Sequence, residues 1–146
     1  MDFDLELKLS IYHHFAEQGS APKAEDLSLR LKRSPEEIVE GFQRLAAKRM
    51  LVLMPDGRSI QMAPPFSGVE TQHRVRVGKV DYFANCAWDA FGIVAALGGA
   101  GEVRSRCEQT GEPLRLQLTR AGPEPSSWVF HTPVPASRWW RDIVFT

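Results

Sequence analysis

The chain has 146 residues and a mass of 16.4 kDa, the size of one domain with room for a small appended module, which excludes a large multidomain enzyme. Its 43% apolar and 25% charged residues, with a mean hydropathy of -0.26, are ordinary for a protein that folds in water and argue against disorder or a membrane protein. Eighteen Lys and Arg balance 18 Asp and Glu, so no global field draws the chain to nucleic acid or to an anionic membrane.

Two helical patterns open the chain. The first covers residues 5–15, and its expected apolar face consists of Leu5, Leu9, Tyr12 and Phe15. The second covers residues 23–31 and carries Leu27 and Leu31 on one face. We expect two short helices here.

A third helix begins at a strong capping sequence. Ser34 is a typical N-cap, Pro35 suits the first helical position, and Glu37 completes a capping box. We expect this helix to run from Pro35 to about Met50, with its apolar stripe formed by Ile38, Phe42 and Leu45.

Residues 51–54, a Pro-Asp-Gly-Arg turn and residues 60–62 predict a short β-hairpin. Three helices followed by such a wing indicate a winged-helix-like module over residues 1–66. A DNA-binding version needs basic residues on the exposed face of the third helix, but that helix opens with Glu36, Glu37 and Glu40. A structural or interface module is therefore favoured, nucleic acid is not an expected partner, and a DNA-binding regulator stays as a further alternative.

Residues 63–68 (APPFSG) are the predicted domain boundary, as a linker or a crossover, because consecutive prolines bar both helix and strand pairing. Beyond it the pattern becomes β-rich, with one apolar helix over residues 85–97 that is ended by a glycine-rich run. Strands are expected at residues 74–77, 102–106, 114–119 and 128–130. The predicted fold class is α+β, with a β-rich domain over residues 67–146 that contains one buried helix.

The longest strongly apolar run, residues 91–101, has about half the length that a bilayer span requires. The acidic start of the chain also lacks the basic region of a signal peptide. A cytoplasmic protein is therefore expected. Cys86 and Cys107 belong to no Cys-x-x-Cys pair, so we expect free thiols.

Cys86 and Asp89 are the densest candidates for chemistry, since they lie three residues apart at the start of the apolar helix. In a first helical turn the N–H groups and the positive helix end favour a thiolate. An apolar core raises the pKa of a neighbouring carboxyl and keeps a proton available. The pair would thus combine a soft nucleophile with a proton donor. A packed core cysteine and a capping aspartate are the structural alternatives.

Other groups carry weaker signals. Cys107 has no partner at metal-ligand spacing and is predicted to be packed rather than to bind zinc. Arginines alternate along two strands and form either a local anion-binding surface or simply the outward faces of those strands; they are Arg74, Arg76, Arg104 and Arg106.

Residues 83–113 (FANCAWDAFGIVAALGGAGEVRSRCEQTGEP) resemble the core of the organomercurial, or alkylmercury, lyases. In that family a Cys-Ala-x-Asp motif opens a helix, and a strand ends in Ser-x-Cys before a Thr-Gly-x-Pro turn. The three helices, the Ser-Pro-Glu-Glu start and the Asp-Gly wing are similar to the family's N-terminal winged-helix module, so the resemblance spans nearly the whole chain.

The resemblance implies roles for individual residues. Cys86 matches the cysteine that binds mercury, and Asp89 matches the carboxyl that delivers a proton and binds the product. Cys107 matches a structural cysteine. Asn85 stands where an aromatic residue occurs in well-known members. The implied reaction is protonolysis of a carbon–mercury bond, which gives a hydrocarbon and thiol-bound Hg(II) as part of mercury resistance. Organomercurials and small thiols are the implied partners, and mercury is substrate and product, with no cofactor required. A non-catalytic protein that binds or senses soft metals is the alternative.

The family's second mercury-binding cysteine would follow Thr146, the last residue of the sequence. Three explanations stay open: the sequence was cut there, the natural product ends there, or the next codon is read as selenocysteine. A site with one thiolate should bind organomercury but cleave it poorly, so the enzymatic activity stays an open question. Exposed aromatic residues at this end would favour a homodimer; they are Trp139, Trp140 and Phe145.

Overall fold

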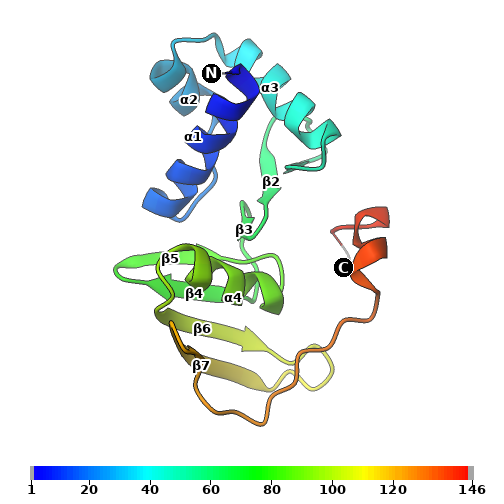
Figure 1. Cartoon of the computed structure of the whole chain (residues 1–146). Helices are drawn as coiled ribbons and strands as arrows, with labels where there is room; N and C mark the ends of the chain where they lie inside the picture. Colours follow the sequence, from blue (N-terminus) through cyan, green and yellow to red (C-terminus); the bar gives the residue numbers. More distant parts are fainter. Residues whose placement is uncertain (1, 145–146) are drawn as a thin grey trace.

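In the computed structural model, which describes residues 2–144, three helices precede a small antiparallel sheet. The helices are α1 (Phe3–Gln18), α2 (Ala24–Leu31) and α3 (Pro35–Ala47). The sheet has the order β1-β2-β3, formed by β1 (Val52–Leu53), β2 (Ile60–Ala63) and β3 (Phe66–Ser67). Figure 1 shows the helices at one end of the molecule, with β2 and β3 leading towards the other end.

The predicted start of α3 is confirmed. The Ser34 hydroxyl accepts a hydrogen bond from the Glu37 N–H at 3.2 Å, and the Ser34 N–H donates to the Glu37 carboxylate at 2.8 Å. The helix ends at Ala47, before the expected Met50, because Arg49 has a left-handed φ of 59° that no α-helix continues. Its predicted stripe of Ile38, Phe42 and Leu45 is buried.

The predicted apolar face of α1 is only partly correct. The buried apolar residues are Leu7, Ile11 and Phe15, whereas Leu5 and Leu9 are 48% and 43% exposed. The sequence offers two stripes at helical spacing, and packing against α3 selects the one that includes Leu7 and Ile11.

The predicted linker is also wrong in its local structure. Residues 63–68 contain a hairpin turn, in which Ala63 pairs with Phe66 and Met62 pairs with Ser67. The two prolines occupy the turn positions between these pairs, so neither has to donate to the ladder. The predicted boundary between residues 66 and 67 falls within β3.

The second sheet has five strands in the order β5-β4-β6-β7-β8, all antiparallel. Its strands are β4 (Arg74–Val77), β5 (Val80–Phe83), β6 (Gly101–Arg106), β7 (Pro113–Thr119) and β8 (Gly122–Pro123). Helix α4 (Ala87–Ala96) packs on one face, where its buried residues meet β4 and β6. The arginines of β4 and β6 are exposed, as predicted for outward faces.

Three differences from the expected second half concern short or terminal segments. Strands β5 and β8 were not predicted, and residues 128–130 form no strand. A 3-10 helix, η1 (Ala136–Arg141), follows instead, and it places Trp140 37% exposed. Phe145, named with Trp139 and Trp140 in the dimer prediction, lies outside the described residues.

Phe66 joins the two sheets. Its ring stacks on Phe15 of α1 at a centroid distance of 5.2 Å and lies 5.7 Å from the ring of Tyr82 on β5. Its backbone forms a bridge to Ala84, just after β5. The Tyr82 hydroxyl donates to the Ala16 carbonyl of α1 at 2.6 Å. One hydrophobic core therefore runs from α1 to the second sheet, and the fold is a mixture of helix and sheet, as predicted.

Between residues 2 and 144, the helices lack the combination of length and apolar character that a bilayer crossing requires.

We predict that Phe66→Ala lowers the free energy of unfolding by about 3–5 kcal/mol, because it leaves a cavity where the two sheets meet. Chemical denaturation followed by tryptophan fluorescence measures this loss. Val129→Ala is the matched control, since Val129 is 85% exposed and its truncation should change the stability by less than about 0.5 kcal/mol. Similar small losses in both variants would contradict a shared core.

Candidate functional site

The junction between β5 and α4 brings Cys86 and Asp89 into one turn. Cys86 is the N-cap of α4, just outside the helix, and its Sγ accepts a hydrogen bond from the Asp89 N–H at 3.4 Å. The helix therefore begins at Ala87, two residues later than expected, with Asp89 as its third residue. Both side chains are half-buried, and the structure places the two predicted site residues together.

Asn85, the residue before Cys86, forms a hydrogen bond with the carboxyl of Asp89. Its Nδ2 donates to Asp89 Oδ2 at 3.0 Å, and the same nitrogen lies 3.3 Å from the Pro65 carbonyl oxygen and 3.1 Å from that of Phe66. These contacts bring the first turn of α4 against the turn between β2 and β3. The approach is close along the helix too, since a Cβ at Gly92 would lie 3.4 Å from Pro65.

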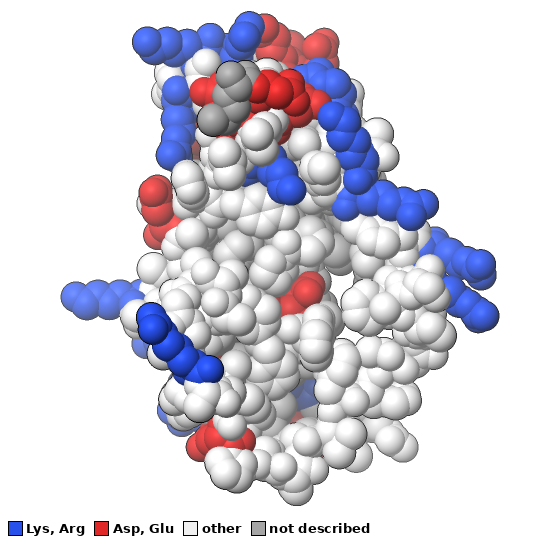
Figure 2. Space-filling view, in the orientation of Figure 1, with Lys and Arg blue, Asp and Glu red and all other residues white. Residues whose placement is uncertain are grey.

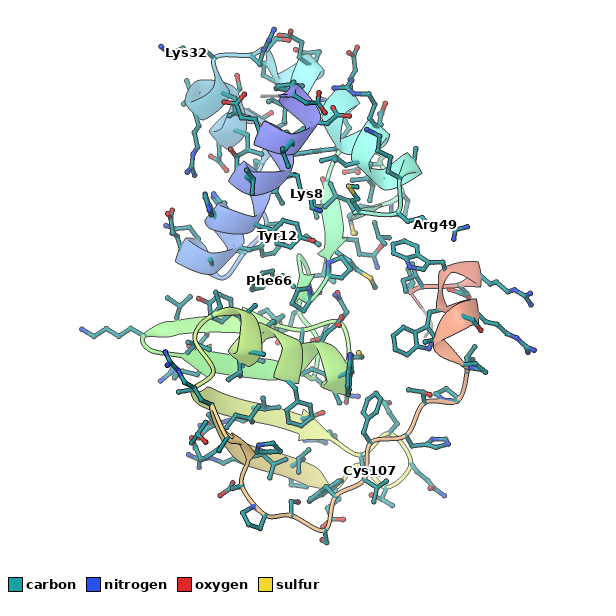
Figure 3. All side chains as sticks on the ribbon, viewed as in Figure 1. Lys8, Tyr12, Lys32, Arg49, Phe66 and Cys107 are labelled. Atoms are coloured by element: carbon teal, nitrogen blue, oxygen red, sulfur yellow. The ribbon has the colours of Figure 1, made fainter. Side chains whose placement is uncertain are left out.

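Helix α1 completes these surroundings. The Tyr12 hydroxyl donates to the Pro64 carbonyl at 2.9 Å, and its ring contacts Phe66 edge-on at 6.2 Å. Figure 3 shows Tyr12 and Phe66 between α1 and the second sheet. Burial and the negative charge of Asp89 both raise the pKa of Tyr12, so this hydroxyl is near enough to sense the carboxylate. The pattern around Cys86 gave no signal for Tyr12, because the contact depends on tertiary structure.

Burial is the main influence on Asp89. It raises the pKa of the carboxyl, while the hydrogen bond from Asn85 opposes that change. Figure 2 shows charged residues gathered over the N-terminal helices and a largely uncharged surface across the middle of the face. A raised pKa favours the proton-carrying form of Asp89, which is the direction that the sequence predicts.

Cys86 differs from the expectation of a favoured thiolate. Burial raises the pKa of its thiol, and the hydrogen bonds from the N–H groups of Asp89 and Trp88, which lower the pKa, do not reverse that shift. The negative charge of Asp89 adds to the rise. Cys86 is therefore a thiol in the free protein. A soft metal ion that binds the sulfur displaces its proton, so deprotonation and metal binding occur together.

The other predicted groups lie elsewhere. Cys107 sits in the turn between β6 and β7, where it is half-buried rather than packed, and hydrogen bonds from Thr110 and the Gln109 N–H lower its pKa. Both cysteines are free thiols, as predicted. His73 is a core histidine whose Nδ1 lies 2.7 Å from the Ser105 hydroxyl. Within residues 2–144, no three His, Cys, Asp or Glu side chains cluster as a metal site.

An apolar hollow of about 730 Å³ lies along another flank of α4. Its lining includes Trp88, Phe91 and Phe130, and the Trp88 and Phe130 rings are 5.5 Å apart. Neither Cys86 nor Asp89 lines it. The hollow is therefore separate from the cysteine–aspartate pair.

The fold and the site define a class: a mixed helix and sheet protein with a half-buried thiol and carboxyl at the start of one helix. The family model of the alkylmercury lyases matches residues 66–146, more than half of the chain and the part that holds this pair. The chain belongs to the alkylmercury lyase family.

The chain is also similar to a solved structure, the mercury-bound form of MerB2. The TM-score is 0.68 at 21% sequence identity, over 87% of this chain and 61% of that one. This likeness concerns the fold, and the chain spans about three-fifths of that protein's length. The search of curated proteins gave no match.

We predict that Asp89→Asn stabilises the protein increasingly as the pH rises above about 4, because the variant need not bury a charge. When folding raises the pKa of a carboxyl, the free energy of unfolding of the protein falls as the pH rises from the ordinary pKa of 3.8 through the raised value. Urea denaturation across this range measures the difference between variant and parent.

Asp81→Asn is the control for that measurement. The Asp81 carboxylate pairs with Arg76 at 2.6 Å, which lowers its pKa, so its replacement should change the stability little or with the opposite sign. A pH-independent difference for Asp89→Asn would show that Asp89 has an ordinary pKa.

Proposed function

We propose that this chain acts as an organomercurial lyase, with Cys86 as the mercury ligand and Asp89 as the proton donor. The observation that supports this most directly is the single turn that holds a half-buried thiol and a half-buried carboxyl, joined by the hydrogen bond from the Asp89 N–H to Cys86 Sγ. Membership of the alkylmercury lyase family supports the same reaction.

The proposed reaction begins when the Cys86 sulfur binds the mercury of an R–Hg–X compound and releases its proton, while X leaves with that proton as HX. Mercury is soft and prefers sulfur. Coordination by a second sulfur, from a small thiol or from a cysteine after Thr146, increases the electron density on the carbon. Asp89 then gives its proton to the carbon, the carbon–mercury bond breaks, and R–H leaves. Hg(II) stays on sulfur, with the Asp89 carboxylate as a further ligand, until two small thiols take it up as a dithiolate complex and their two protons return to Cys86 and Asp89.

We also propose that residues 1–66 form a winged-helix-like module that covers the site in residues 67–146. Two sets of contacts support this role: Asn85, just before α4, donates to the Pro65 and Phe66 carbonyls, and Tyr12 of α1 donates to the neighbouring Pro64 carbonyl. The exposed Glu36 and Glu40 at the start of α3 give no support to DNA binding.

Two further expectations stay proposals. The exposed Trp140 and Val144 support pairing with a second copy of the chain. A selenocysteine after Thr146 would appear in the intact mass and the selenium content of protein made from the native gene.

The proposed activity predicts hydrocarbon release from an arylmercury compound in excess small thiol, measured by gas chromatography. The chain is compared with a version that carries one added cysteine after Thr146, and Cys86→Ser and Asp89→Ala are made in both. We expect the extended chain to be faster than the parent and each substitution to lower the rate at least about 100-fold, as general acid catalysis alone contributes that much. Cys107→Ser is the matched control and should retain turnover.

Stoichiometric mercury binding without hydrocarbon release from either version would overturn the lyase proposal. It would favour the alternative, a soft-metal binding or sensing member of the family, because that function needs Cys86 but no proton donor.

A further inference from the structure

The side-chain amide of Asn85 has an unusual set of contacts. Its Nδ2 lies within hydrogen-bond distance of three oxygen atoms: Asp89 Oδ2 at 3.0 Å, the Phe66 carbonyl at 3.1 Å and the Pro65 carbonyl at 3.3 Å. An amide nitrogen carries two hydrogens, so its donor capacity is fully used. One side chain therefore joins the turn between β2 and β3 to the carboxyl on α4.

The orientation of this amide is fixed by its neighbours. Turning it over would place Oδ1 against three oxygen atoms, all of them acceptors when Asp89 is ionised. In the present orientation Oδ1 is buried and has no hydrogen-bond partner within residues 2–144. A buried acceptor without a partner reduces stability. The three contacts of Nδ2 therefore outweigh the cost of leaving Oδ1 without a hydrogen bond.

The contact with Asp89 also distinguishes the two carboxyl oxygens. Asp89 Oδ2 accepts the N–H of Asn85. A protonated carboxyl has only one O–H, and a donor that faces Oδ2 disfavours a second hydrogen there. The acid proton is therefore directed to Oδ1, which Asn85 leaves free.

We propose that Asn85 is the positioning residue of this site: its amide, anchored by the Pro65 and Phe66 carbonyls, holds Asp89 so that Oδ1 carries the proton to the leaving carbon. The inference rests on the proposed function, because it assigns a direction to the proton transfer of that reaction. It also makes the β2–β3 turn part of the machinery that orients Asp89.

The test uses Asn85→Ala and Asn85→Leu, the second of which keeps most of the side-chain volume. In the extended chain we expect kcat for hydrocarbon release to fall about 10- to 100-fold, the usual effect of removing a partner that orients a metal-site group. KM and the mercury affinity should change little, because Cys86 is untouched. Equal losses in mercury affinity and kcat would overturn the proposal, since Asn85 would then support Cys86 or the fold.

A second readout needs no turnover. Side-chain coupling constants from NMR of the free protein report whether Asp89 occupies one χ1 rotamer. We expect a single rotamer in the parent chain and rotamer averaging in both Asn85 variants. Gln117→Ala is the matched control, because Gln117 Nε2 donates to the Glu102 carboxylate at 2.6 Å on β7, away from the site; it should change neither readout.

The two hypotheses fail in different ways. If the parent and extended chains release no hydrocarbon, the lyase proposal is overturned, and the rotamer measurement alone decides whether Asn85 orients Asp89. If Asp89 keeps one rotamer in both Asn85 variants, or if kcat is unchanged while the rotamers average, the positioning role of Asn85 is overturned.

Discussion

The contact between the β2–β3 turn and the first turn of α4 is the interaction on which the site depends. Phe66 fills the core between α1 and β5, so the turn that precedes it cannot move away from the second sheet without opening a cavity. That turn and the start of β3 present the Pro65 and Phe66 carbonyls to Asn85. Packing in the core therefore fixes the carbonyls that Asn85 contacts just before α4. Through Asn85 it also fixes the position of the Asp89 carboxyl.

The same packing raises the pKa of both groups in the site. Cys86 and Asp89 are both half-buried next to uncharged surroundings, and burial raises the pKa of each. A raised thiol pKa suits a reaction that starts with metal binding, since the sulfur then loses its proton when a soft cation replaces it. A raised carboxyl pKa favours the protonated form of Asp89 that the proposed reaction needs, relative to a fully exposed carboxyl.

The structure also separates this site from features with similar residue types. Cys107 occupies an exposed turn whose hydrogen bonds lower the pKa of its thiol, in contrast to Cys86. The apolar hollow beside Trp88 lies along α4 but excludes the reactive pair. What distinguishes Cys86 is the neighbouring half-buried carboxyl of Asp89, which the Asn85 side chain links to the Pro65 and Phe66 carbonyls.

Local sequence was enough to predict features that depend on neighbouring residues. The capping box at Ser34, the hairpin around Asp56, the helix after Cys86 and the pairing of Cys86 with Asp89 all follow from interactions within one turn. The contacts that span many residues were decided by tertiary structure. Nothing near Pro64 and Pro65 indicates that their turn pairs with β3 and faces α4, and nothing near Asn85 indicates a triple contact with that turn. Burial likewise reversed the expected thiolate at Cys86, because desolvation depends on the whole fold and a helix start does not reveal it.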